Sequence, residues 1–182
     1  MLNSMFISDP ERDEEDRHMI YLIIGTPDSG KSKLAEDLVL SISGNKARCY
    51  IATMIPYGVE GDLRVSKHRR MREGKDFTTF EKPFDICETE IPSDSIVLLE
   101  CVSNLAANEL FERHTHEDKC EEKLISDILA LADSADDIII VTNHFDITDD
   151  FDEETIRYAC LMERLNSRLS KAADKVIDLT KK

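Results

Sequence analysis

The sequence predicts an α/β fold: a single domain with a mostly parallel sheet and helices on both of its faces. Short apolar segments rich in β-branched residues recur along the chain, and each is bounded by turn-forming residues, as buried strands are. Segments with the helical spacing of apolar residues lie between them. Strands that alternate with helices favour a parallel sheet. The 182 residues are enough for one domain with a substantial core.

The strands and helices can be placed in order along the chain. Strands are expected at residues 19–25, 48–54, 95–101, 137–143 and 175–179. Helices are expected at residues 31–43, 105–113, 121–132 and 153–172. In the first helix, Leu34, Leu38 and Ile42 form one apolar stripe. Residues 57–93 show the least regular pattern.

Charge narrows the classes of partner. The formal net charge is −15, from 38 acidic and 23 basic residues. Such a surface repels nucleic acid and anionic membranes, so we expect neither as a partner. No apolar run approaches the roughly 20 residues that a membrane span needs, so no membrane span is expected.

The N-terminus and the cysteines indicate the compartment. Residues 1–18 are polar and acidic, and we expect a flexible tail there rather than a signal peptide. The five cysteines are scattered, without a C-x-x-C pair, and are interpreted as reduced thiols. The sequence therefore predicts a cytoplasmic protein.

A phosphate-binding loop follows the first strand. The segment fits G-x-x-x-x-G-K-[ST] completely and has a strand before it and a helix after it. Its residues are Gly25, Thr26, Pro27, Asp28, Ser29, Gly30, Lys31 and Ser32. The glycines let backbone N–H groups surround an oxyanion, and the lysine can reach the β- and γ-phosphates of a nucleotide. The chain is thus predicted to be a P-loop NTPase-like domain.

Two oxygen donors are candidates for a Mg²⁺ site. The Ser32 hydroxyl is placed to ligate the ion beside the phosphates. Glu100 follows the apolar run "IVLL" and ends the third expected strand. An acidic residue at the carboxyl end of a neighbouring strand can hold the metal or its waters, although helix caps and surface residues also occupy such positions.

The segment "DLRVSKHRRMR" contains an unusual histidine. Arg64, His68 and Arg72 are spaced by four residues, so on a helix they share one face. Two guanidinium groups could bind phosphate oxygens and keep the imidazole neutral, ready to attack an α-phosphate. From the spacing alone, a solvated basic helix with an inert histidine is the favoured interpretation.

A further metal site is conceivable in "ERHTHEDKC". His114 and His116 form an H-x-H pair with Cys120 nearby. Because no second cluster of ligands accompanies them, a plain solvent-facing loop is the favoured interpretation.

From Met19 to Val176 the chain resembles the bifunctional adenosylcobinamide kinase / adenosylcobinamide-phosphate guanylyltransferase family of cobalamin biosynthesis. The motifs that carry the resemblance occur in order along the sequence. They are the phosphate-binding loop, "YIAT" (50–53), "R-V-x-x-H-x-x-x-R" (64–72), "T-x-E-x-P" (79–83), "LLECVSNLAAN" (98–108), "VTN" (141–143) and "RLNSRLSKAADKV" (164–176).

The resemblance implies roles for individual residues. His68 matches the histidine that becomes guanylylated, which reverses the interpretation favoured by spacing. Lys31 and Ser32 match the nucleotide-phosphate and Mg²⁺ positions, and Glu100 matches the acidic residue of the second motif strand. The remaining matches, at positions close to the nucleotide, are Arg64 and Glu81.

The resemblance also implies the reactions and the assembly. ATP or GTP would phosphorylate the aminopropanol hydroxyl of adenosylcobinamide, a corrinoid. GTP would then donate GMP through His68 to give adenosylcobinamide-GDP and pyrophosphate. Residues 19–182 would form this kinase and guanylyltransferase domain, and the chain would assemble as a homo-oligomer, with a trimer the expected form.

Two departures from the family pattern leave alternatives open. Pro27 and Asp28 occupy the middle of the loop, where the family carries a basic residue, and "HFD" (144–146) follows "VTN". A divergent homologue that binds nucleotide but lacks one or both activities is one alternative. A P-loop kinase for another small alcohol is the other.

Overall fold

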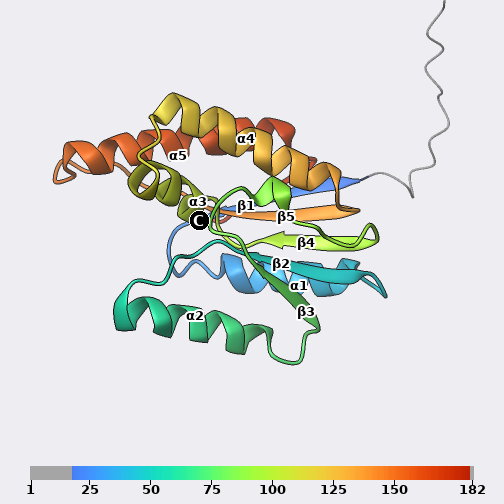
Figure 1. Cartoon of the computed structure of the whole chain (residues 1–182). Coiled ribbons are helices and arrows are strands. Elements are labelled where there is room, and N and C mark those ends of the chain that lie inside the picture. The colour runs from blue at the N-terminus through green and yellow to red at the C-terminus, as the bar shows by residue number, and fades with distance from the viewer. Residues whose placement is uncertain (1–17, 181–182) are drawn as a thin grey trace, which may run out of the picture.

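The strands assemble into one six-stranded, all-parallel sheet at the centre of the molecule (Figure 1). The computed structural model describes residues 18–180, so the tail predicted at residues 1–18 lies, except for His18, outside the described residues. The strand order is β3-β2-β4-β5-β1-β6. The strands are β1 (Met19–Gly25), β2 (Ala47–Ala52), β3 (Phe77–Glu81), β4 (Ser95–Leu99), β5 (Asp137–Asn143) and β6 (Lys175–Asp178). The predicted α/β class is confirmed.

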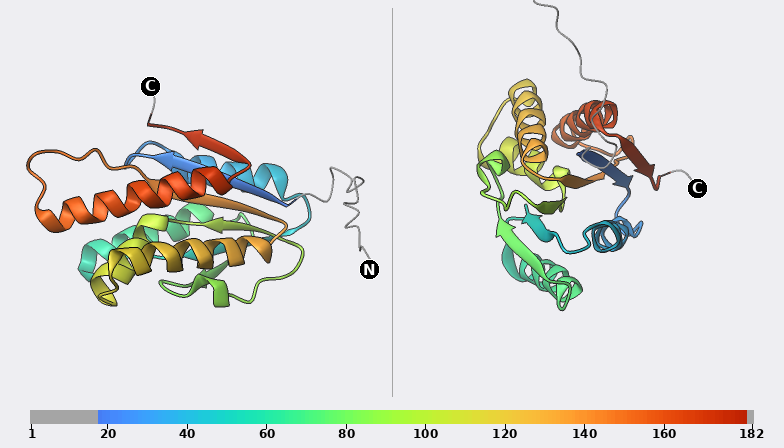
Figure 2. Two further views of the ribbon diagram at one scale, coloured as in Figure 1. Left: turned by 90° about the horizontal axis from the view of Figure 1, so that it is seen from above. Right: turned by 90° about the vertical axis from the view of Figure 1, so that its right-hand side faces the viewer.

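Helices cover both faces of the sheet. They are α1 (Lys31–Ile42), α2 (Gly58–Arg72), α3 (Val102–Ala107), α4 (Glu117–Asp133) and α5 (Glu153–Ala172). In Figure 1 and in the right-hand view of Figure 2, α4 and α5 lie on one side of the strands, and α1 and α2 lie on the other. A short 3₁₀ turn, η2 (Ile86–Glu88), and a π-helical turn, η3 (Asn108–Glu112), complete the connections.

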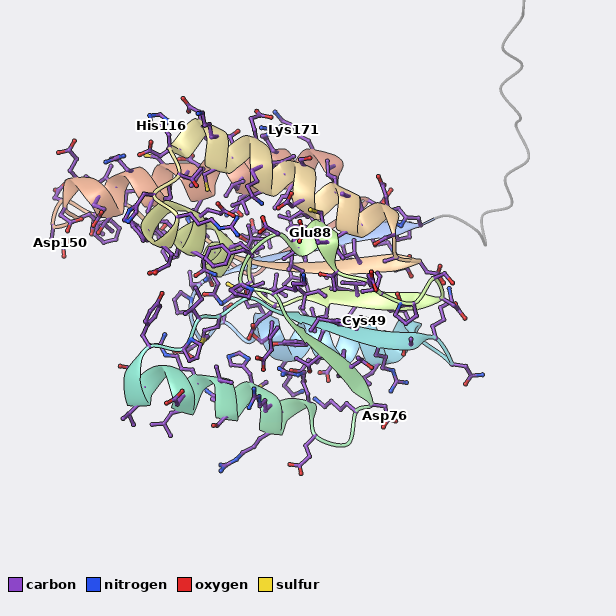
Figure 3. The ribbon with its side chains drawn as sticks, in the orientation of Figure 1. Cys49, Asp76, Glu88, His116, Asp150 and Lys171 are labelled. Carbon is purple, nitrogen blue, oxygen red and sulfur yellow. The ribbon has the colours of Figure 1, made fainter. Side chains whose placement is uncertain are left out.

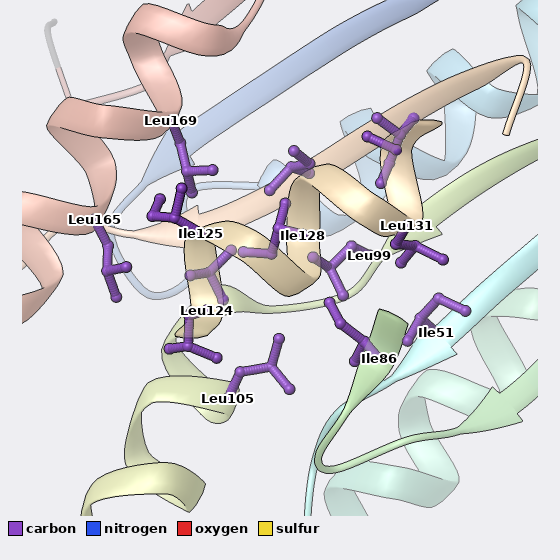
Figure 4. Packing of buried hydrophobic residues seen from close by; sticks show 14 of the residues in the cluster. Ile51, Ile86, Leu99, Leu105, Leu124, Ile125, Ile128, Leu131, Leu165 and Leu169 are labelled. Carbon is purple, nitrogen blue, oxygen red and sulfur yellow. The ribbon is translucent and has the colours of Figure 1, made fainter. Parts of the chain in front are cut away.

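Alternation along the strands divides the core into two apolar clusters. Successive side chains of a strand point to opposite faces, so Leu22 joins one cluster and Ile23 the other. The larger cluster lies under α3, α4 and α5. Figure 4 shows part of it, where Ile128 of α4 packs near Leu99 of β4. Both faces of the central strands are therefore buried, which explains their continuous apolar runs.

The structure differs from the sequence prediction in the region without a clear pattern. Residues 57–93 contain a complete helix, α2, and an edge strand, β3. Phe77 and Phe80 are only half-buried, so β3 lacks the apolar run of a central strand. Its pairing with β2, in which Arg48 lies opposite Phe77, is a tertiary contact that local pattern does not report.

The predicted helix at residues 105–113 starts earlier and ends differently. It begins at Val102, and its last turn is the π-turn η3. In this turn the Asn108 amide donates hydrogen bonds to the carbonyl oxygens of Thr53 and Pro83, at 2.9 and 2.8 Å. Single π-turns within helices occur often at functional sites.

The register of the sheet brings the strand ends together. Gly25 at the end of β1 lies opposite Asn143 at the end of β5. Leu99 at the end of β4 lies opposite Ile140 of β5. The residues that follow these strands therefore meet at one edge of the sheet, the position where parallel sheets bind ligands. Within residues 18–180, no helix has both the length and the apolar character required to cross a membrane.

Candidate active site

The phosphate-binding loop joins β1 to α1 and depends on two glycines. A Cβ added at Gly25 would lie 2.3 Å from Ser29 Oγ and 3.3 Å from Ser29 Cβ, so a larger residue would displace the Ser29 side chain. Gly30 has φ +84°, a left-handed conformation that L side chains rarely adopt. α1 begins at the next residue, so its free N–H groups and the positive end of its dipole point to the loop.

Lys31 is the charged group at the centre of this loop. Its Nζ donates a hydrogen bond to the Thr26 carbonyl oxygen at 2.9 Å, which folds the side chain back over the loop. Burial lowers the pKa of Lys31, while the charge of Asp28 acts in the opposite direction. An ammonium group has three N–H donors, and a buried one with few partners gains free energy when it binds phosphate oxygens.

A cavity of about 540 Å³ opens beside the loop. Eight of the predicted site residues line it: Pro27, Asp28, Gly30, Lys31, Ser32, Arg64, His68 and Glu100. Gly25, Thr26 and Ser29 shape the loop without lining the cavity. The remaining lining residues were not predicted: Lys33, Met54, Lys67, Met71, Cys101, Asn104, Val141 and Asn143.

The candidate nucleophile faces the candidate metal ligand. His68 Nδ1 lies 3.3 Å from Glu100 Oε1, and this nitrogen is buried without a hydrogen bond of good geometry. The other carboxylate oxygen of Glu100 accepts a hydrogen bond from the Thr53 backbone N–H at 3.2 Å. The side chain of Glu100 is only 9% exposed, so it is held in one place beneath α2.

Arg64 and Arg72 were both considered as phosphate-binding partners of His68, and the structure places only Arg64 in the cavity. Arg64 lines the cavity and forms an ion pair with Glu60 at 2.6 Å. Arg72 is buried elsewhere, with its guanidinium carbon 3.6 Å from the centroid of the Tyr50 ring. The reason is position along the helix: Arg72 ends α2, where the helix approaches the sheet.

Glu81, the last predicted residue, lies at the end of the edge strand β3. Its carboxylate forms an ion pair with Arg69 at 2.5 Å, and both side chains are exposed. It is not among the residues that line the cavity. The structure therefore does not bring Glu81 together with the phosphate-binding loop.

A polar network at the ends of β4 and β5 was missed. The Asn143 amide donates to Ser103 Oγ at 2.5 Å, and Ser103 Oγ lies 2.7 Å from Cys101 Sγ. Asn166 on α5 donates to the Asn143 carbonyl oxygen at 2.9 Å. The Oδ1 atom of Asn143 is buried and has no partner among the described residues. Cys101, Ser103 and Asn143 lie at or just after the ends of buried strands, a position that could have located them, whereas Asn166 lies within α5 and has no such signal.

The alternative metal site is not supported. Cys120 is buried in the core, whereas His116 lies at the start of α4 on the outer surface (Figure 3). Across residues 18–180, no three His, Cys, Asp or Glu side chains are grouped to hold a metal ion. The histidine pair is an ordinary surface feature.

The family comparison decides the class of protein. A family model described as cobinamide kinase / cobinamide phosphate guanyltransferase matches residues 21–181, nearly the whole chain. The chain belongs to this family. As a cobinamide kinase / guanyltransferase family member it is an enzyme of cobalamin biosynthesis, with nucleotide and cobinamide as expected substrates.

The structural comparison supports the fold of this family member. The chain is similar to a solved structure whose title describes an ATPase domain, with a TM-score of 0.53 and 12% sequence identity. The similarity covers 90% of this chain and 69% of that one. At this identity it shows a shared P-loop ATPase fold alone. The search of curated proteins finds no match.

Proposed function

We propose that the chain phosphorylates adenosylcobinamide with ATP or GTP and then transfers GMP from GTP to the phosphorylated product through a guanylyl-histidine at His68. The observation that carries the proposal is that His68 and Lys31 line one cavity, so one bound nucleotide can reach both. An ordinary P-loop kinase needs no histidine at this place.

In the kinase step, Lys31 would bind the β- and γ-phosphates and neutralise the charge that develops during transfer. The residues present fit a Mg²⁺ ion, because Ser32 and Glu100 both line the cavity and supply the oxygen donors that this ion prefers. When bound, the ion would supply positive charge that stabilises the phosphate oxygens during transfer.

In the guanylyl step, the proposed nucleophile is Nε2 of His68. Since Nδ1 faces the Glu100 carboxylate, a proton on Nδ1 leaves the lone pair on Nε2. Attack on the α-phosphorus of GTP forms a P–N bond and releases pyrophosphate. A phosphate oxygen of the phosphorylated cobinamide then attacks the same phosphorus, the P–N bond breaks, and the imidazole is restored.

Labelling with GTP radioactive at the α-phosphate tests the guanylyl step. Wild type should acquire an acid-labile, alkali-stable label, and His68→Ala should lose it. His144→Ala is the matched control, because His144 is a histidine outside the cavity lining, and it should label as wild type does. An unlabelled wild type, or a labelled His68→Ala variant, would contradict the proposed intermediate.

Turnover of the Lys31→Ala variant tests the kinase step. We expect phosphorylation of adenosylcobinamide to fall by about 100-fold or more, because the transition state loses a preorganised positive charge. Lys171→Ala, at an exposed position on α5, should keep full turnover. Unchanged turnover in Lys31→Ala would exclude the assigned role.

A second candidate function has one specific observation in its favour. Asp28 places a carboxylate in the cavity beside the phosphate positions, where it repels a nucleotide. A homologue that binds nucleotide for regulation, without catalysis, would tolerate this repulsion. Calorimetry separates the two functions: binding of GTP without binding of adenosylcobinamide favours the regulatory protein.

The proposal includes assembly and location. A homo-oligomer, with a trimer as the expected form, is supported by the resemblance of the sequence to its family. A cytoplasmic location is supported by the five scattered cysteines, which form no C-x-x-C pair. Sedimentation of the purified chain measures the first of these directly.

A further inference from the structure

A second cavity lies between the end of α2 and the edge strand β3, and the activity described above does not use it. Its volume is about 370 Å³. Asp76, labelled in Figure 3, marks the turn that joins these two elements. The residues that line the cavity are Arg69, Arg70, Arg72, Glu73, Phe77 and Thr79. None of them lines the phosphate-loop cavity.

Arg72 is the unusual member of this set. The residue is only 8% exposed, and its Nη1 atom is buried without a hydrogen-bond partner. Among the residues that the structure describes, none forms an ion pair with it; its contact is the Tyr50 ring at 3.6 Å. The face of the Tyr50 ring attracts the guanidinium charge, but the buried Nη1 group has lost water without gaining an acceptor, which is costly.

Of the two other arginines that line this cavity, one is paired with a carboxylate and one is not. Arg69 is already paired with Glu81 at the rim. Arg70 is exposed, and no described residue forms a hydrogen bond or ion pair with its guanidinium group. Three arginines against one glutamate therefore line the cavity, in a chain whose net charge is −15.

The helix end alone does not explain this arrangement. Basic residues in the last turn of a helix complement its dipole, which accounts for the exposed Arg69 and Arg70. The helix dipole does not account for Arg72, because an interaction with the dipole still leaves the buried Nη1 group without an acceptor. The feature that remains unexplained is an acceptor for Arg72.

We infer that this cavity binds the phosphate group of a small molecule. Arg72 and Arg70 would donate to its oxygens, and the planar guanidinium suits phosphate through paired N–H groups. The Thr79 hydroxyl is a further donor in the lining of the cavity. Since His68 lies one turn earlier on the same helix, the bound phosphate would also fix the end of the helix that carries the candidate nucleophile.

The test is calorimetry of the full chain with Lys31→Ala, so that binding at the phosphate loop does not mask the second site. Inorganic phosphate and AMP are the two probes, at low ionic strength. We expect one phosphate per chain. In the same background, Arg70→Gln should weaken binding at least five-fold and Arg72→Met should abolish it. Arg157→Gln, an exposed arginine on α5, is the matched control and should bind as the parent does.

The outcomes distinguish free phosphate from a nucleotide as the ligand, and they distinguish results that support the site from results that overturn it. Equal affinity for the two probes identifies phosphate alone, and tighter binding of AMP identifies a nucleotide; both support the site. No binding in the Lys31→Ala chain, or equal binding by Arg70→Gln and Arg157→Gln, overturns it. Because Arg72→Met could fail to fold, the fold of this variant is checked by circular dichroism. If Arg72→Met is unfolded, the result for Arg70→Gln alone decides.

One further result would also overturn the inference. If sedimentation shows that Arg70→Gln dissociates an oligomer while phosphate affinity is unchanged, the arginines form a contact between protein chains. None of these measurements uses turnover, so the result does not depend on whether the proposed kinase and guanylyl steps occur.

Discussion

The helices α4 and α2 lie on opposite faces of the same sheet and are held in opposite ways. Seven of the 17 residues of α4 are buried, most of them apolar, and they fill the larger core cluster. Of the 15 residues of α2, only Arg72 is buried. The apolar side chains of Val59 and Leu63 are 77% and 64% exposed.

The difference shows that α4 stabilises the sheet, whereas α2 carries a residue of the candidate site. Burial of apolar area fixes α4 against the strands and thereby fixes the strand ends that shape the site. α2 carries His68 to the cavity, yet contacts near its last turns, such as Arg69 with Glu81 and Arg72 over Tyr50, connect it to the sheet. Such contacts contribute less than a packed apolar face.

The largest expected effect comes from breaking the packed side. Ile128→Ala on α4 removes a side chain with no exposed area, so we expect the free energy of unfolding to fall by about 2–5 kcal/mol. Urea denaturation measures it, with Ile156→Ala, a partly exposed isoleucine of α5, as the control of smaller effect. A loss below about 1 kcal/mol would contradict the assignment of α4 as the scaffold.

A smaller effect is expected from the ionic contacts that fasten α4. Asp85 bonds to Arg113 and to Lys123 of α4, and these bonds hold the pKa of the Asp85 carboxyl well below its usual range. A lowered pKa in the folded state stabilises the protein above the ordinary pKa of about 4, and the stabilisation is lost as the pH falls below it.

We therefore expect Asp85→Asn to cost about 1–2 kcal/mol at pH 7, since the group is partly exposed, and progressively less below pH 4. Urea denaturation at several pH values checks this. Asp149→Asn, at an exposed position without these contacts, is the control. A difference between Asp85→Asn and wild type that grows as the pH falls would show that the sign is wrong.

The smallest effect is expected on α2. Leu63→Ala should change the free energy of unfolding by less than about 0.5 kcal/mol, because Leu63 buries little area and alanine favours the helix. Urea denaturation of dilute protein measures it. A loss of more than about 1 kcal/mol would mean that another surface covers this face, and the contrast between α2 and α4 would then be narrower.

Much of the fold could be predicted because its signals are local. The runs that form β1, β4 and β5 are continuous and apolar, and they are buried on both faces, so composition alone indicates them. The phosphate-binding loop is equally local, because Gly30 is required by the left-handed backbone conformation of the loop and Gly25 by the Ser29 side chain four residues on. Helices on both faces were predicted, but the strand order and the assignment of each helix to one face were not.

The candidate site was predicted in part. Lys31, Ser32, His68 and Glu100 do line one cavity, as expected from their motifs. Cys101, Asn104 and Asn143 were not assigned. Their position near the ends of buried strands marks the correct edge of the sheet, but only the parallel register shows that they lie beside the loop. Arg72 shares a helical spacing with His68, but the approach of the helix end to Tyr50 takes it into a different environment.

The sequence by itself determined the α/β class, the phosphate-binding loop and the motifs that place the chain in its family. These depend on composition, on spacing and on backbone conformations within a few residues. Only the tertiary structure decided that His68 faces Glu100, that Arg72 leaves the nucleotide cavity, and that β3 forms the edge of the sheet. Contacts between residues far apart in the chain depend on how helices and strands pack, and that packing is set by the whole core together.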